Sequence, residues 1–141
     1  MVALENVLMV VWHGSQEQYQ KYPDLAGRFI SEFGMQALPS PRTITHFITN
    51  PNEYYPQSQT MDHHNKATGF ERRLGAYVLE NFRLNKFDME EYVIESQRMQ
   101  ADALATAYRG WRQKWQGPGR EYVAGALVWQ VHDSWMLTIV E

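Results

Sequence analysis

Hydrophobic residues recur with a helical period along residues 88–115. They are spaced four or seven positions apart, which places them on one face of a helix: Tyr92, Met99, Ala103, Ala107, Trp111 and Trp115. Asp88 stands just before this stripe, and Gly117-Pro118-Gly119 follows it. Because glycine and proline interrupt helices, the pattern predicts one long helix that begins near Asp88, ends before Gly117 and buries this stripe.

Two shorter runs have the composition of β-strands. Residues 26–34 (AGRFISEFG) predict a short buried strand that ends near Glu32, and residues 121–130 (EYVAGALVWQ) predict a strand buried on both faces. The apolar start of the chain, residues 1–11, is also compatible with a strand. Because a long helical connection separates the two clearer strands, we expect them to be parallel, as in a βαβ unit.

Shorter helices are expected in the connection between the strands. Ser40 followed by proline predicts a helix over residues 41–48. Residues 50–59 (NPNEYYPQSQ) predict a loop, since they hold two prolines and show no helical period. Residues 60–82 then predict a second helix, capped by Asp62.

The length of 141 residues allows one domain. A complete (β/α)₈ barrel needs about 250 residues, so two parallel strands with helices between them cannot form one. The sequence therefore predicts an α/β fold that is either an unusually small protein or a part of a larger one.

Composition and charge restrict the function. Hydrophobic residues make up 44% of the chain and charged residues 21%, which is typical of a folded protein. The net charge of −3 gives no basic surface for nucleic acid. No apolar run is as long as a membrane span, which needs about 20 residues, so a membrane segment is not expected. No basic residue precedes the first apolar residues, so a signal peptide is not expected either. These features predict a soluble, cytoplasmic protein.

Glu32 is the first candidate for chemistry. It lies at the carboxyl-terminal end of a predicted buried strand, the edge where parallel α/β barrels carry their active-site groups. A carboxylate in such a place is usually paired or functional, because burial of an unpaired charge is costly. The alternative is an ordinary ion pair with Arg28 or Arg42.

Trp129 and Trp12 are candidates for a sugar-binding surface. Trp129 ends the second predicted strand, and Trp12 precedes a glycine upstream of the first. An indole ring packs against the C–H face of a sugar while neighbouring polar groups bind its hydroxyls. Either residue could instead be a packing residue.

A metal or cofactor site is not expected. The chain has no cysteine, which excludes thiolate ligands and disulfides. His63 and His64 are adjacent and point in different directions, with no carboxylate at a ligand spacing.

Several ungapped blocks resemble the β-mannosidases of glycoside hydrolase family 2. The run RFISEFGMQALPSPRTI is similar to the nucleophile strand of these enzymes, and YRGWRQKWQGPGREYVAGALVWQVHDSW to their last barrel strand. YPQSQTMDHHNKATGFERR is similar to their connecting helices. The resemblance covers residues 12–135 and keeps the order of the blocks.

The resemblance implies a fold and an activity. The fold class would be α/β, with residues 1–141 forming a fragment of a (β/α)₈ TIM-barrel domain that holds about its last two strands and the long connecting helices. The activity would be that of a retaining exo-β-mannosidase, which releases terminal β-linked mannose from β-mannoside oligosaccharides or the N-glycan core. Glu32 matches the family's nucleophile and Trp129 the tryptophan that lines the sugar site; Trp12 would add to that site.

The chain departs from the family in its second carboxylate. The family's acid/base is the glutamate of an Asn-Glu pair that precedes the nucleophile, whereas the only such pair here, Asn52-Glu53, follows it in a proline-rich loop. His132-Asp133-Ser134-Trp135 also differs from the family's ending. We therefore expect this chain by itself to be inactive as a hydrolase. The alternative function is a non-catalytic, carbohydrate-binding or interaction remnant of such an enzyme.

Overall fold

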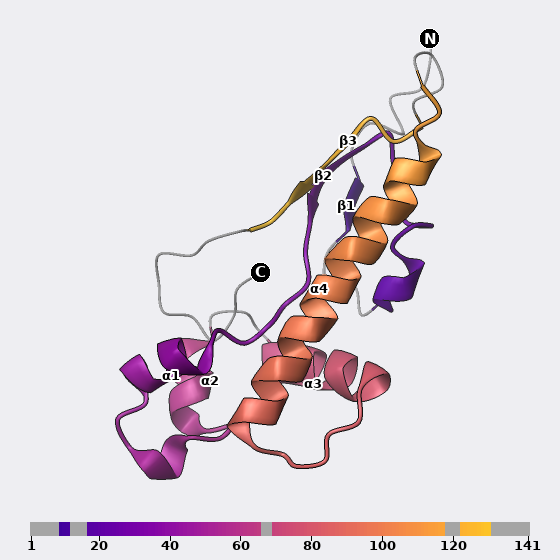
Figure 1. The fold of residues 1–141 in the computed structure, drawn as a ribbon. Coiled ribbons are helices and arrows are strands. Elements are labelled where there is room, and N and C mark those ends of the chain that lie inside the picture. Colours follow the sequence, from indigo (N-terminus) through magenta and orange to yellow (C-terminus); the bar gives the residue numbers. More distant parts are fainter. Residues whose placement is uncertain (1–8, 12–16, 66–68, 118–121, 131–141) are drawn as a thin grey trace. The chain divides into compact units, whose positions relative to one another are not determined.

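The structure is a computed structural model that describes residues 9–11, 17–65, 69–117 and 122–130 (Figure 1). The elements follow one another as β1 (Met9–Val11), η3 (Tyr19–Lys21), β2 (Phe29–Phe33), α1 (Pro41–Phe47), η4 (Pro51–Glu53), α2 (Gln59–His64), α3 (Phe70–Asn81), α4 (Met89–Lys114) and β3 (Gly125–Val128). The chain divides into two compact units. The first contains residues 1–35 and 101–129, and the second contains residues 36–100 and 130–141.

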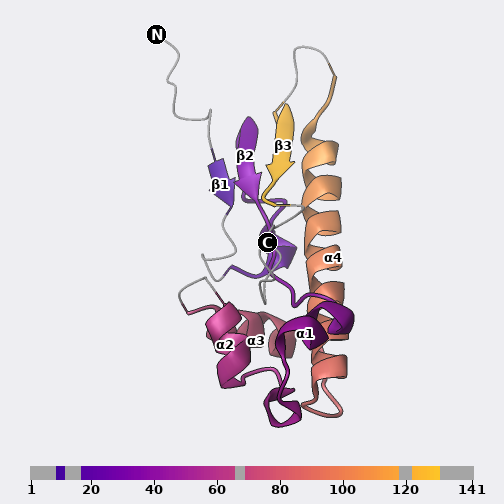
Figure 2. The same cartoon turned by 90° about the vertical axis from the view of Figure 1, so that its left-hand side faces the viewer.

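The first unit contains a parallel sheet of three strands in the order β1-β2-β3, as Figure 2 shows. Parallel pairing of β2 and β3 confirms the expectation from the sequence. The start of the chain contributes β1 as a third strand, which makes β2 the central strand. β2 ends at Phe33, one residue beyond the predicted end.

The central strand contains a β-bulge at Ser31. On one side Met9 pairs with Ile30 and Val10 with Glu32, so Ser31 has no counterpart in β1. On the other side the pairs are Ile30 with Ala126 and Phe33 with Val128. Two residues of β2 therefore lie opposite one residue of β3. Bulges bend a strand and redirect the side chains beside the extra residue, and they are frequent next to active sites.

The prediction that residues 121–130 form a strand buried on both faces is wrong. β3 covers only Gly125–Val128, Leu127 is 56% exposed, and Trp129 is 50% exposed. Within the described residues β3 is an edge strand that pairs with β2 alone, which leaves part of its surface open. The apolar residues of this segment predicted a buried strand, because the sequence alone does not show whether a further strand pairs with β3.

The carboxyl-terminal half of α4 runs beside the sheet of the first unit (Figure 2). Ala103, Ala107 and Trp111 are buried there, as the stripe predicts. Phe33 of β2 packs edge-on against Trp111, with ring centroids 4.7 Å apart. Trp115 departs from the stripe: α4 ends at Lys114, and the Trp115 ring is 38% exposed with the Arg112 guanidinium 4.7 Å from its centroid.

The second unit is helical. Ser40 caps α1 as predicted, because its side chain accepts a hydrogen bond from the Thr43 N–H. Residues 50–59 are largely irregular, with the short turn η4 inside them. The first half of α4 packs here against residues 36–38: the Leu38 N–H donates to Ser96 Oγ at 3.1 Å, and the Gln97 side chain donates to the Leu38 carbonyl at 3.1 Å.

The predicted single helix over residues 60–82 is two helices, α2 and α3. α2 ends at His64 and is capped by Asn65, whose N–H donates to the Asp62 and Met61 carbonyls. α3 follows Gly69, which has a φ of +72°. Asp62 is not the cap. Ser58 caps α2 by accepting from the Met61 N–H, because Asp62 already lies inside the helix.

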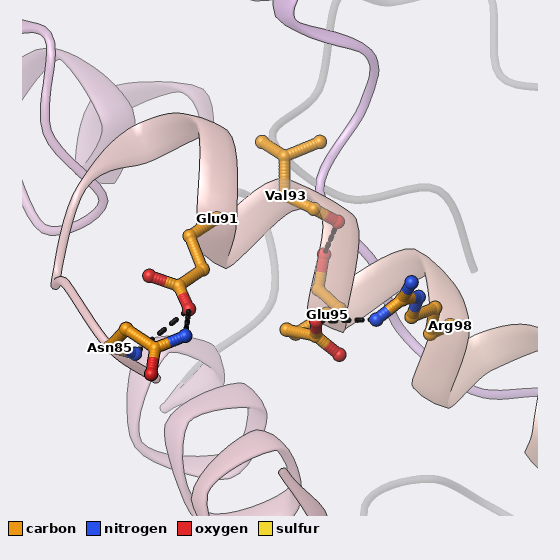
Figure 3. Close-up of polar contacts among 6 residues, drawn as sticks. Asn85, Glu91, Val93, Glu95 and Arg98 are labelled. Atoms are coloured by element: carbon orange, nitrogen blue, oxygen red, sulfur yellow. Dashed lines mark hydrogen bonds and ion pairs between the residues drawn. The ribbon is translucent and has the colours of Figure 1, made fainter. Parts of the chain in front are cut away.

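A carboxylate organises the entry to α4 (Figure 3). Glu91 Oε1 accepts from the Asn85 N–H at 2.8 Å and the Asn85 side-chain amide at 3.0 Å, and Oε2 accepts from the Lys86 N–H at 2.7 Å. These hydrogen bonds lower the pKa of Glu91. Asp88 Oδ1 accepts from the Glu91 N–H at 2.9 Å, which confirms Asp88 as the residue that starts the helix.

Candidate active site

Glu32 lies in the carboxyl-terminal half of the central strand, directly after the extra residue of the bulge. It is half-buried, between the fully buried Ile30 and Phe33. Within the described residues its carboxylate forms neither a salt bridge nor a hydrogen bond to another side chain. The ion pair with Arg28, which would have explained this carboxylate as a structural residue, is therefore not formed in the first unit.

Trp129 follows directly after β3, at the same edge of the sheet as the end of β2. Its N–H donates to the Phe33 carbonyl at 2.8 Å, a bond that joins the carboxyl-terminal ends of the two strands. The Trp129 side chain is half exposed, so a flat ring is open to a ligand at this edge. The structure thus brings Glu32 and Trp129 onto neighbouring strand ends, as the sequence predicts for an active-site edge.

Aromatic residues that were not predicted as site residues pack behind this edge of the sheet. Phe33 packs edge-on against Tyr108 at 5.0 Å and against Trp111 at 4.7 Å between ring centroids. Trp111 Nε1 donates to the Tyr22 carbonyl at 2.8 Å, and the Tyr22 hydroxyl donates to the Gly34 carbonyl at 3.2 Å. The sequence predicts burial of Trp111 from its position on the helical stripe, but not its contacts with Phe33 and Tyr22. No sequence pattern marks Tyr22, because its partners are 12 and 89 positions away.

Two further candidates are Trp12 and the adjacent pair His63 and His64. Trp12 is outside the described residues, as are the Pro118-Gly119 part of the helix breaker and residues 132–135. His63 and His64 belong to α2 in the second unit, where the His64 ring stacks on Phe47 with centroids 4.0 Å apart. Within the described part of the chain, no cluster of three or more histidine, aspartate or glutamate residues could hold a metal ion.

The Glu53 carboxylate forms a hydrogen bond within the second unit. Its Oε2 accepts from the Thr60 N–H at 3.1 Å, which ties η4 to the first turn of α2. A carboxylate near a helix N-terminus stabilises the free N–H groups there. The Asn52-Glu53 pair therefore has a role in local folding.

A pocket of about 200 Å³ opens at the opposite end of β3. It is lined by aromatic and small residues of α4 and of the segment that leads into β3: Tyr108, Trp111, Arg112, Trp115, Val123, Ala124, Gly125 and Ala126. These residues precede or begin β3, whereas Trp129 follows it. The pocket includes neither Glu32 nor Trp129, so it is distinct from the candidate active site.

The amino-acid sequence of this chain is similar to those of several known proteins. The chain is 50% identical over 131 residues to β-mannosidase B of Thermothelomyces thermophilus, which covers 91% of this chain and 15% of that protein. It is 50% identical over 125 residues to β-mannosidase B of Emericella nidulans, covering 89% of this chain and 14% of the relative. The resemblance to the β-mannosidases is therefore confirmed. The chain spans about 15% of the length of the curated relatives that it matches.

The fold of this segment is also shared. A crystal structure of β-D-mannosidase from Dictyoglomus thermophilum superposes with a TM-score of 0.81 at 42% identity, covering 92% of this chain and 15% of that one. A scan against models of protein families gives no match. None of the described helices has the length and apolar character needed to cross a membrane.

Proposed function

We propose that this chain is the nucleophile-bearing part of a retaining exo-β-mannosidase of glycoside hydrolase family 2. In this proposal residues 1–141 are a fragment of its (β/α)₈ TIM-barrel domain. β2 and β3 correspond to the last two barrel strands, and α1 to α4 form the connection between them. The observation that carries the proposal is Glu32, a half-buried carboxylate that forms no ion pair with the described residues. It lies at a bulge of the central strand, beside the strand end that holds Trp129. Similarity to β-mannosidases over about nine-tenths of the chain supports it.

Glu32 acts as the nucleophile in this proposal. Its carboxylate attacks the anomeric carbon of a terminal β-mannoside, so that a bond from carboxylate oxygen to C1 forms as the bond to the leaving oxygen breaks. A second carboxyl group, about 5–5.5 Å away in retaining enzymes, donates a proton to that oxygen and then takes one from the attacking water. Water releases mannose and restores the Glu32 carboxylate.

Trp129 provides the platform for the sugar ring, and Trp12 adds to the same site. The indole face binds the C–H side of mannose by dispersion and by excluding water, while the carboxylates act at C1. The substrates would be β-mannoside oligosaccharides or the N-glycan core, with no cofactor. We expect that the 141-residue chain alone does not turn over unactivated mannosides, because the Glu53 carboxylate of its only Asn-Glu pair already accepts a hydrogen bond from the Thr60 N–H.

A chimera tests this proposal. In β-mannosidase B of Thermothelomyces thermophilus, the matching segment is replaced by the corresponding residues of this chain, and the product is treated with 2-deoxy-2-fluoro-β-mannosyl fluoride. Fluoride departs without help from a general acid, so the probe reports the nucleophile directly. We expect one covalent mannosyl adduct, located on Glu32 by peptide mass spectrometry.

Two variants of the chimera complete the test. Glu32→Gln should abolish labelling and lower kcat by at least about a thousandfold. Glu53→Gln is the matched control and should retain both labelling and turnover. Labelling at another residue, or full activity of the Glu32→Gln variant, would overturn the assignment. Turnover of an unactivated mannoside by the 141-residue chain would overturn the claim that it is incomplete as a hydrolase.

A further inference from the structure

The segment after η3 is fixed firmly to α4. Trp111 Nε1 donates to the Tyr22 carbonyl at 2.8 Å, and Lys114 Nζ donates to the Pro23 carbonyl. Gly110 allows this close approach, because a Cβ atom at that position would lie 2.4 Å from Pro23 Cγ. The main chain at Tyr22 is thus held against the helix on one side.

The Tyr22 side chain reaches the other way, to the strand. It is fully buried, and its hydroxyl donates to the Gly34 carbonyl at 3.2 Å. Phe33, the residue before Gly34, packs on Trp111, which is the same side chain that bonds the Tyr22 carbonyl. These contacts form a closed ring through Tyr22, Gly34, Phe33 and Trp111, which we call the Tyr22 clamp.

The clamp acts where regular sheet pairing is interrupted. The bulge at Ser31 removes one residue of β2 from the ladder just before Glu32, so the backbone there has fewer ladder bonds to fix it. Beyond Glu32, the Trp129 N–H holds the Phe33 carbonyl and the Tyr22 hydroxyl holds the Gly34 carbonyl. Rate in a displacement reaction depends on how closely the attacking group is held to the productive geometry.

We propose that Tyr22 is a positioning residue for the Glu32 nucleophile, acting through its hydrogen bond to the Gly34 carbonyl. This inference rests on the proposed function, because it assigns Tyr22 a role in the reaction that Glu32 carries out. Tyr22 does not touch the substrate. It restricts the strand end so that the carboxylate of Glu32 stays aligned with C1 of the sugar.

The test uses Tyr22→Phe, which removes one hydroxyl and leaves the ring in place. The matched control is Tyr19→Phe, a buried tyrosine of the same segment, whose pKa is raised by burial and by the nearby Asp102 of α4. In the chimera, Tyr22→Phe should lower kcat for an aryl β-mannoside by about tenfold and change KM less than twofold. Tyr19→Phe should leave both unchanged. A purely structural role would lower the amount of active enzyme and not the rate constant for labelling per active site.

A second measurement separates this inference from the proposed function. Amide hydrogen exchange of Trp129 in the 141-residue chain reports the strand end without any substrate. Tyr22→Phe should speed this exchange about tenfold, and Tyr19→Phe should not. Unchanged exchange, or faster exchange with unchanged kcat, overturns the inference. If the unsubstituted chimera neither labels nor turns over, the proposed function fails and the catalytic role of Tyr22 fails with it, while exchange still shows whether the clamp holds the strand.

Discussion

The Trp129 N–H donates a hydrogen bond to the Phe33 carbonyl at 2.8 Å. This bond joins the ends of β2 and β3 one residue beyond Glu32. Because it uses only main-chain atoms, it keeps the two strand ends together whatever side chain stands at 129. The indole ring is therefore free to serve a ligand.

Replacement of the Trp129 ring tests its role in sugar binding without disturbing the hydrogen bond that joins the two strands. Trp129→Ala keeps the main-chain hydrogen bond and removes a ring that is 50% exposed, so stability should change little. In the chimera, kcat/KM for a β-mannoside should fall about tenfold, equivalent to about 1.4 kcal/mol of transition-state binding. Trp115→Ala, which also removes a partly exposed indole, is the control and should leave kcat/KM within twofold. Equal losses in the two variants would argue against a sugar platform at Trp129.

Two helical glycines should respond in opposite ways to alanine. At Gly110 a Cβ atom would lie 2.4 Å from Pro23 Cγ, so Gly110→Ala should destabilise the 141-residue chain by about 1–3 kcal/mol despite the better helix propensity of alanine. At Gly75 the nearest atom is the Tyr92 hydroxyl at 3.7 Å. Gly75→Ala should therefore be neutral or stabilising by up to about 1 kcal/mol. Urea unfolding measures both, and a stabilised Gly110→Ala variant would contradict the close packing of α4 on Pro23.

The carboxylate of Glu91 makes the entry to α4 sensitive to acid. Hydrogen bonds from the Asn85 and Lys86 N–H groups depress its pKa in the folded chain, so the folded state favours the ionised form. Its contribution to stability is complete above the unfolded pKa of about 4.5 and is lost as the pH falls through the folded value. Glu91→Gln should lower the midpoint of thermal unfolding at pH 7.

The difference between wild type and Glu91→Gln should shrink as the pH falls below about 4.5. Glu80→Gln, which removes an exposed carboxylate on α3, should unfold like the wild type at both pH values. A Glu91→Gln difference that stays constant from pH 7 to pH 3 would show that ionisation of Glu91 is not the cause.

Tyr92 makes the stability of the folded chain fall at high pH, whereas Glu91 makes it fall at low pH. Burial, and to a smaller extent the nearby Glu71 carboxylate, raise the pKa of Tyr92 to about 12. The folded chain therefore keeps its phenol protonated where the unfolded chain, with a pKa of about 10, does not. Wild type should lose about 2–3 kcal/mol of stability between pH 10 and 12 that Tyr92→Phe does not lose.

Urea unfolding at pH 9 and pH 11.5 tests the role of Tyr92. Tyr55→Phe, in which the ring replaced is 45% exposed, should follow the wild type. Parallel losses of stability in wild type and Tyr92→Phe would exclude the Tyr92 phenol as the source.

Sequence patterns predicted the elements whose signals are local. The long helix α4 was predicted almost to the residue, since its stripe repeats over 26 residues and Asp88 stands at its start. The parallel pairing of β2 and β3 followed from the length of the connection between them. The position of Glu32 and Trp129 at one edge of the sheet followed from that pairing.

Features that depend on distant contacts were missed or misassigned. The exposure of β3 depends on whether a further strand pairs with it, and the Tyr22 clamp depends on partners 12 and 89 positions away. The break between α2 and α3 was missed because the apolar positions at helical spacing, Phe70, Leu74 and Val78, all lie in α3, so the pattern did not mark where α2 ends. Trp115 was expected to be core because its spacing fits the stripe, whereas α4 ends one residue earlier.

The extra residue at Ser31 is not needed to bury the strand. Ile30 and Phe33 pair with Met9 and Val11 and are both buried, whereas Glu32 pairs with Val10, on the opposite face. Deletion of Ser31 would leave these three side chains on the same faces and restore regular alternation, and it would remove only the local bend of the bulge. Retention of the extra residue among relatives would therefore point to a need for the bend itself, and not for burial of the strand.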